Sequence, residues 1–244
     1  MLDHLNIENI LFLDIETVPQ YPAYRELPET FQKLWDRKAD HFRKEDQTPE
    51  DIYDRAGIYA EFGRIICISA GFVMQKMGER YYRVKSFYDD DERKLLSAFN
   101  NMLEKFTAYP GKCLCAHNGQ EFDYPYIARR ALINGLKLPH ILDMAGMKPW
   151  ELKDKLLDTM QLWKFGDFRS YTSLSLLCAV FNIPTPKDDI DGSQVARVYY
   201  EEGDLERIAR YCEKDTLAVA NLLLRFKREP VIEADHVEII DANS

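Results

Sequence analysis

Residues 10–17 have the sequence ILFLDIET, and this stretch decides the fold that we expect. Its first six residues, Ile10 to Ile15, are apolar β-formers with one terminal acid, which predicts a buried strand. Because alternate side chains of a strand point to the same face, Asp14 and Glu16 project together while Ile15 points the other way. Two such carboxylates repel each other where the dielectric constant is low, and a bound divalent cation would stabilise them. The alternative is that the strand has already ended and both acids are solvated.

Further strands and helices follow along the chain. Apolar runs predict strands at 64–74, 80–87 and 112–116, and helical spacing predicts helices at 91–106, 122–134, 173–181, 193–201 and 204–227. Residues 20–62 are charged, contain three prolines and are too long for an ordinary loop, so we expect a small helical insertion between the first two strands. The order of elements predicts an α/β protein with a mixed central β-sheet flanked by α-helices. We expect one domain over residues 1–228 and an acidic C-terminal tail over 229–244.

Composition limits the class of protein. Hydrophobic residues make up 46% of the 244, enough for a sizeable core, and no apolar run approaches the ~20 residues of a membrane span. The N-terminus lacks the pattern of a signal peptide. The five cysteines form no C-x-x-C pair, so we expect buried free thiols in a reducing cytoplasm and no zinc site. A net charge of −9 excludes binding of nucleic acid by bulk attraction, although a carboxylate cluster is neutralised once it holds cations.

Two later motifs carry further acids. In HNGQEFD, residues 117–123, Asp123 falls in the first turn of a predicted helix, where its charge meets the positive end of the helix dipole. In YCEKD, residues 211–215, Tyr211 and Asp215 share one face of the last long helix. A carboxylate on an apolar helix face is costly unless it is paired or bound to a metal. Taken singly, each motif also fits an ordinary helix-start acid or a boundary position.

In combination these motifs resemble the DnaQ-like exonuclease superfamily, which carries an Asp-Glu-Asp-Asp metal site on a ribonuclease H-like fold. Tyr211 is similar to the tyrosine branch of that superfamily. The contexts LFLDIET, AHNGQEFDYPYIARRA, LLDTMQLWKFG and IARYCEKDTLAVANLL look most like the proofreading exonuclease domain of family B DNA polymerases, especially its stand-alone bacterial relatives. The resemblance covers most of the chain, from Ile10 to about Arg225, and implies an exonuclease without an attached polymerase.

The resemblance implies a metal-dependent 3′–5′ exonuclease with two divalent ions, Mg²⁺ or Mn²⁺, ~3.5–4 Å apart. It implies that Asp14 bridges both ions and that Glu16 and Asp215 hold the ion carrying the attacking water. Asp123 would reach the second ion, and Tyr211 would orient the water. Oxygen ligands of this kind suit hard cations.

The same resemblance implies four contacts to the terminal nucleotides: Thr17, Asn118, Phe122 and Asp158. From the residues alone, Phe122 either stacks on a base or belongs to the core, and Asn118 is equally a turn residue. The basic and aromatic stretch from Trp163 to Tyr171 either follows the phosphate backbone or covers a satellite core.

Single-stranded DNA is the expected partner, in preference to RNA, and no membrane is expected. Three alternatives stay open: an exoribonuclease with the same site, a module that binds a 3′ end without cutting it, and a structural protein whose acids are merely surface charge.

Overall fold

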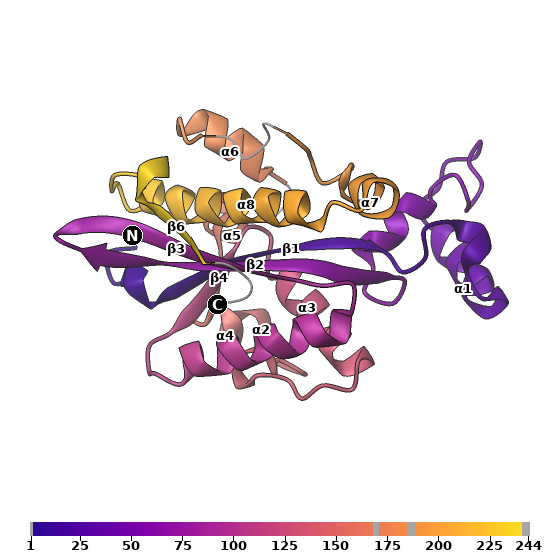
Figure 1. The fold of residues 1–244 in the computed structure, drawn as a ribbon, viewed down its shortest axis with the longest axis horizontal. Helices are drawn as coiled ribbons and strands as arrows, with labels where there is room; N and C mark the ends of the chain where they lie inside the picture. Colours follow the sequence, from indigo (N-terminus) through magenta and orange to yellow (C-terminus); the bar gives the residue numbers. More distant parts are fainter. Residues whose placement is uncertain (1, 168–170, 185–188, 241–244) are drawn as a thin grey trace.

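The computed structural model describes residues 2–167, 171–184 and 189–240, and within these ranges six strands form one sheet (Figure 1). The strands are β1 (Ile10–Pro19), β2 (Gly63–Lys76), β3 (Glu79–Tyr88), β4 (Cys113–Ala116), β5 (Leu156–Asp158) and β6 (Val237–Ile240). Their order across the sheet is β5-β4-β1-β2-β3-β6. Strand β1 pairs antiparallel with β2 and parallel with β4, so the sheet is mixed, as predicted.

Helices cover both faces of the sheet. The α-helices are α1 (Glu29–Ala39), α2 (Glu92–Thr107), α3 (Asp123–Ile133), α4 (Pro149–Leu152), α5 (Thr159–Lys164), α6 (Leu174–Val180), α7 (Val195–Arg197) and α8 (Leu205–Phe226). Short 3-10 turns lie at Ile7–Asn9, Tyr24–Glu26, Tyr53–Ile58, His140–Leu142 and Ala234–His236. Helices α6, α7 and α8 lie on one side of the sheet, and α2, α3 and α4 lie on the other (Figure 1). This architecture confirms the predicted ribonuclease H-like α/β fold. Among the described residues no helix has the length and apolarity needed to cross a membrane.

Alternation along β1 divides the apolar core into two layers. The layer under α2 and α3 receives three of its side chains, Leu11, Leu13 and Ile15. The layer under α8 receives Ile10 and Phe12. Because side chains two residues apart share a face, the same alternation directs Asp14 and Glu16 toward α8. The core that stabilises the sheet therefore also orients the two acids of the first motif.

The helix boundaries follow the capping signals of the sequence. Asp91 caps α2 by accepting a hydrogen bond from the Lys94 amide at 3.1 Å, and Asp204 caps α8 in the same way through the Arg207 amide at 3.0 Å. Gly135, with φ of 68°, follows α3 in the left-handed conformation that favours glycine.

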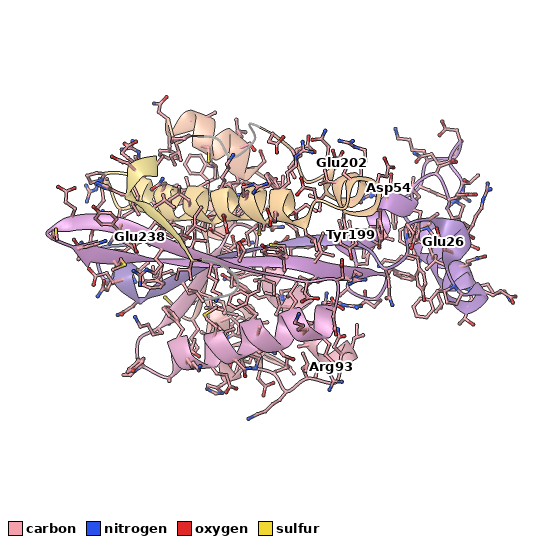
Figure 2. All side chains as sticks on the ribbon, in the orientation of Figure 1. Glu26, Asp54, Arg93, Tyr199, Glu202 and Glu238 are labelled. Carbon is pink, nitrogen blue, oxygen red and sulfur yellow. The ribbon has the colours of Figure 1, made fainter. Side chains whose placement is uncertain are left out.

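Strands β5 and β6 and one helical turn differ from the sequence expectations. Strand β5 is only three residues long, too short to leave a periodic signal, and β6 lies inside the segment expected to be a tail. Glu238 of β6, labelled in Figure 2, forms ion pairs with Arg83 at 2.7 Å and Lys76 at 2.8 Å. The predicted helix over 193–201 is α7 followed by a π-helical turn, Val198–Glu202.

The insertion at residues 20–62 contains α1 and an aromatic core of its own. Trp35 is fully buried, and its ring packs edge-on against those of Tyr53 and Phe62 at centroid distances of 5.7 and 5.4 Å. Leu27 is also buried there, whereas Phe31, an expected apolar anchor, is partly exposed.

A buried ion pair joins the insertion to the main domain. Arg130 of α3 contacts Glu92 of α2 through two hydrogen bonds of 2.9 and 2.5 Å, and the two side chains are 5% and 7% exposed. Arg130 also donates to the Ala60 carbonyl oxygen at 2.8 Å, while Glu92 accepts from the Ile65 amide at 2.7 Å. This pair therefore fixes α2, α3, β2 and the end of the insertion to one another.

Replacing Arg130 with alanine should lower the free energy of unfolding by about 3–5 kcal/mol, because the Glu92 carboxylate would stay buried without its cation. Urea denaturation measures this change. The exposed neighbour Arg129→Ala serves as control, with an expected change within about 0.5 kcal/mol. A loss below about 1 kcal/mol for Arg130→Ala would show that the pair does not carry this junction.

Candidate active site

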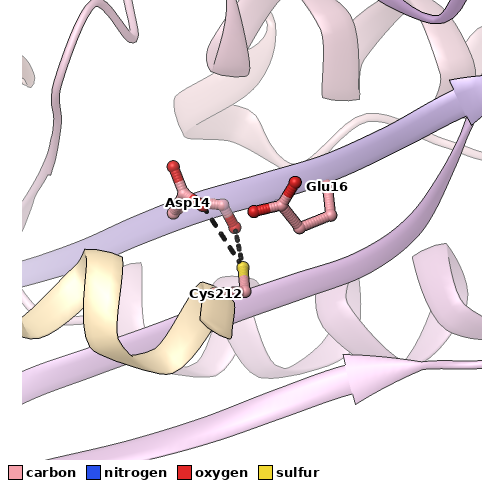
Figure 3. A group of neighbouring side chains, drawn as sticks. All are labelled: Asp14, Glu16 and Cys212. Atoms are coloured by element: carbon pink, nitrogen blue, oxygen red, sulfur yellow. Dashed lines mark hydrogen bonds between the residues drawn. The ribbon is translucent and has the colours of Figure 1, made fainter. Parts of the chain in front are cut away.

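Asp14 and Glu16 of β1 meet Cys212 of α8 at one end of the layer under that helix (Figure 3). One donor atom of each lies within 4.8 Å of the others. The Cys212 thiol donates to the Asp14 carbonyl oxygen at 3.3 Å and to Asp14 Oδ2 at 3.4 Å. The solvated-acid alternative is therefore wrong for this pair, since Glu16 is only 7% exposed.

The pairing of β1 with β2 changes at this point. Asp14 lies opposite Ser69 and Glu16 opposite Cys67, but Thr17 lies opposite Ile65, so one residue of β2 is left over. Such a bulge re-aims the side chains that follow it and is common beside active sites. Before the bulge, the regular register places the Cys67 side chain directly across from Glu16, on the same face of the sheet.

Helix α8 supplies the residues that face β1. Its middle and C-terminal part is apolar, with Val219 and Leu223 in the layer shared with β1. One turn earlier the same helix presents Asp215, and a further turn earlier Tyr211, both buried. The Tyr211 hydroxyl is hydrogen-bonded to Asp215. The layer thus changes from apolar to acidic along its length, and the acidic end contains the two motifs from opposite ends of the chain.

Asp123 approaches the same acids from the N-terminus of α3. Its side chain is 3% exposed and is hydrogen-bonded to backbone groups of Asp123 itself and of Ile15. Its charge contributes to the pKa shifts of both Asp14 and Glu16. The structure therefore brings together all four carboxylates that the motifs singled out.

Burial and mutual repulsion make this group electrostatically unfavourable. Burial raises the pKa of Asp14 well above its ordinary value, and the neighbouring carboxylates, Asp215 first, raise it further. The pKa of Glu16 is raised for the same two reasons, and burial raises that of Asp123 to about 8. Among the described residues none donates a hydrogen bond to the Glu16 carboxylate, although it is almost fully buried. A cluster of oxygen donors with this charge fits a hard divalent cation.

The Asp158 side chain is hydrogen-bonded to the loop that precedes Asp123. Its carboxylate is 2% exposed and accepts hydrogen bonds from the amides of Asn118 and Gln120, each at 3.0 Å. It also caps α5 by accepting from the amides of Met160 at 2.9 Å and Gln161 at 3.3 Å. These four hydrogen bonds to backbone amides do not favour the substrate contact predicted for Asp158. They indicate that Asp158 positions the loop and the start of α5 instead.

The other three predicted substrate contacts remain partly exposed. Asn118 has φ of 64°, and its buried amide oxygen has no hydrogen-bond partner within the described ranges. The Phe122 ring packs on Tyr126 at a centroid distance of 5.3 Å. Thr17 follows Glu16 directly in β1, and Phe122 directly precedes Asp123. Asn118 lies in the loop before Asp123, which Asp158 holds.

Within the basic and aromatic stretch from Trp163 to Tyr171, the residues differ in burial, so no single one of the two alternatives fits them all. The Trp163 ring packs against Phe181 at 5.6 Å and Phe226 at 6.1 Å, which supports the satellite-core alternative. Phe165 and Tyr171 are exposed. Phe168 and Arg169 lie outside the described residues.

The sequence did not indicate the place of the cysteines. All five are buried and free, as predicted. However, the contact of Cys212 with Asp14 depends on how α8 packs on β1, and the place of Cys67 opposite Glu16 depends on the register of β1 with β2. The only sequence signal for Cys212 is its position next to Tyr211 in the third motif.

Two comparisons with known proteins bear on the fold. The chain is 25% identical over 138 residues to an uncharacterized protein of Methanocaldococcus jannaschii, covering 54% of this chain and 64% of that protein. The family B DNA polymerase from the hyperthermophilic archaeon Pyrobaculum calidifontis superposes with a TM-score of 0.53 at 16% identity. The match covers 89% of this chain and 24% of the polymerase chain, so the chain spans about a quarter of that protein.

A family model also matches the chain over residues 58–235, which include the second and third motifs. Asp14 and Glu16 lie before the matched residues. The family is described as predicted 3′–5′ exonucleases related to the exonuclease domain of PolB. Because the match extends over most of the chain and agrees with the observed fold, the protein belongs to this family of predicted PolB-related 3′–5′ exonucleases.

Proposed function

We propose that the protein is a metal-dependent 3′–5′ exonuclease that hydrolyses the terminal phosphodiester bond of a nucleic-acid strand. The observation that carries this proposal is the convergence of four carboxylates, of which Glu16, Asp123 and Asp215 are buried and Asp14 is partly exposed. Glu16 has no hydrogen-bond donor among the described residues. An anionic cluster so far removed from water is unfavourable unless cations neutralise it.

Each residue of the cluster would have a separate role in hydrolysis. Asp14, Glu16, Asp123 and Asp215 would hold two divalent cations, Mg²⁺ or Mn²⁺. When bound, such cations lower the pKa of a water molecule and offset the charge that develops on the leaving 3′ oxygen. Burial raises the pKa of Tyr211, so this residue stays protonated and orients the water by hydrogen bonding instead of removing its proton. Asp123 is positioned by its backbone hydrogen bonds and, through the preceding loop, by Asp158.

The substrate we propose is a single-stranded DNA 3′ end, in preference to RNA. Support comes from the family description, which relates these proteins to a DNA-polymerase exonuclease domain. Thr17, Asn118 and Phe122 are partly exposed beside the carboxylates and would contact the terminal nucleotides.

The exonuclease domain, predicted over residues 1–228, would extend to β6, since that strand pairs with β3, and the insertion at 20–62 would border the substrate groove. The insertion begins three residues after Thr17, and Tyr126 of α3 holds it by donating to the Gly57 carbonyl oxygen at 2.7 Å.

The first prediction concerns activity. With 5′-labelled single strands of DNA and RNA of equal sequence, the wild type should produce a ladder that shortens from the 3′ end in Mg²⁺ or Mn²⁺ but not in EDTA. Asp14→Ala should lower the rate more than about 100-fold, because the cations lose a shared ligand. The exposed Asp154→Asn should cleave like the wild type.

The ratio of DNA to RNA cleavage tests the preferred substrate. A folded wild type that binds a 3′ end but cleaves neither strand with either metal would support the binding-module alternative and contradict the proposal.

The second prediction concerns stability. In EDTA at neutral pH, Asp14→Asn should raise the unfolding temperature and stabilise the protein by about 0.5–2 kcal/mol, because a carboxyl group with a raised pKa no longer has to be buried. The gain should fall as the pH drops through ~3.9, the pKa of an unfolded aspartate, and should vanish near pH ~3, where that aspartate is itself largely protonated. Mg²⁺ should stabilise the wild type and not the variant. A variant less stable than wild type in EDTA at neutral pH would refute the role assigned to repulsion.

The third prediction concerns the insertion. Replacing residues 24–52 by a short flexible linker keeps the segment 57–60 that Tyr126 and Arg130 hold. The shortened protein should retain its fold by circular dichroism and bind single strands more weakly in fluorescence anisotropy. If the shortened protein is folded and binds single strands with unchanged affinity, the insertion does not border the substrate groove.

A further inference from the structure

Sulfur lies beside the oxygen cluster. The Cys212 thiol is 3.4 Å from Asp14 Oδ2, and its sulfur lies within 4.8 Å of donor atoms of both Asp14 and Glu16. In Figure 3 the side chains of Asp14 and Glu16 point from β1 toward this sulfur. Hard cations such as Mg²⁺ bind oxygen and gain nothing from a thiolate, whereas Zn²⁺ and Cd²⁺ prefer one.

A second thiol lies nearby. Cys67 lies opposite Glu16 in the β1–β2 register and is fully buried, with its sulfur 3.8 Å from the Ser69 hydroxyl oxygen. It does not belong to the group of donor atoms that lie within 4.8 Å of one another. One thiol and two carboxylates, supplied by α8 and β1, therefore surround one small volume.

The spacing of these donors suits a tetrahedral ion. Zinc bonds of about 2.3 Å to sulfur and 2.0–2.2 Å to oxygen place neighbouring ligand atoms about 3.5 Å apart. The Cys212 sulfur and Asp14 Oδ2 are already at 3.4 Å. Glu16 supplies an independent indication of a ligand, because it is 7% exposed and accepts no hydrogen bond from any described residue.

We propose that Cys212, Asp14 and Glu16 form a binding site for one thiophilic divalent cation, of the class of Zn²⁺ and Cd²⁺. Binding displaces the Cys212 thiol proton to solvent and leaves a thiolate ligand. The site shares Asp14 and Glu16 with the cations of the proposed nuclease, so a thiophilic ion and Mg²⁺ exclude each other there. This exclusion, which rests on the proposed function, makes a thiophilic metal an inhibitor of the enzyme.

Cadmium titration tests the site without nucleic acid. Adding CdCl₂ to the reduced protein should produce an ultraviolet thiolate-to-metal charge-transfer band that saturates at one equivalent per chain. Cys212→Ser should abolish the band. Cys178→Ala is the matched control, because Cys178 is buried in a different cluster and its variant should keep the full band.

A second variant keeps the test decisive if Cys212→Ser fails to fold. Replacing Cys67, Cys113, Cys115 and Cys178 by alanine leaves Cys212 as the one thiol of the protein, and the band should persist unchanged. No band in the wild type, or an undiminished band in folded Cys212→Ser, would overturn the inference.

The cadmium titration and the nuclease assay test the two proposals separately. A cadmium band without Mg²⁺-dependent cleavage would support the thiophilic site and contradict the proposed function. Cleavage in Mg²⁺ without a cadmium band would support the proposed function and contradict the thiophilic site.

Discussion

Four carboxylates share a volume from which most water is excluded, and the structure around them is arranged to make this possible. Burial and mutual repulsion raise the pKa of Asp14, Glu16 and Asp123. Such a cluster is unfavourable for folding, so the surrounding elements must hold it with energy gained elsewhere. The two apolar layers on either side of β1 supply that energy, and the alternation of one strand assigns its acids to a single face.

Two polar anchors hold the remaining parts in register with the cluster. Asp158 accepts four backbone hydrogen bonds and joins the loop before Asp123 to β5 and α5. Arg130 and Glu92 join α2 and α3 to β2 and the insertion. Both anchors are buried and fully paired, which is the condition under which polar groups specify one arrangement instead of weakening the core. These paired anchors hold the scaffold next to the acids of the site in one arrangement.

The sequence predicts the elements whose signal is local. The apolar run before Asp14, the helical spacing before Asp91 and the Asn134-Gly135 stop all correspond to observed boundaries. It also singles out the acids that the fold brings together. Strand β5, with three residues, and β6, which pairs with a strand about 150 residues earlier in the chain, carry no such signal. The same limit applies to Asp158 and Cys212, whose partners lie 38 to 40 and 198 residues away. Their roles are properties of packing, not of any window of sequence.

The central place of β1 has a dynamic consequence. Its edges are paired to β2 and, over Ile10 to Phe12, to β4, and both of its faces are covered by core. Exposing this backbone requires separating two strands and two layers at once, an opening with a free energy near that of global unfolding. The amide hydrogens of β1 should therefore exchange among the slowest in the molecule. In the proposed enzyme, adjustment to strand ends of different shape would then fall to Asn118 and the insertion, while β1 would not move with them.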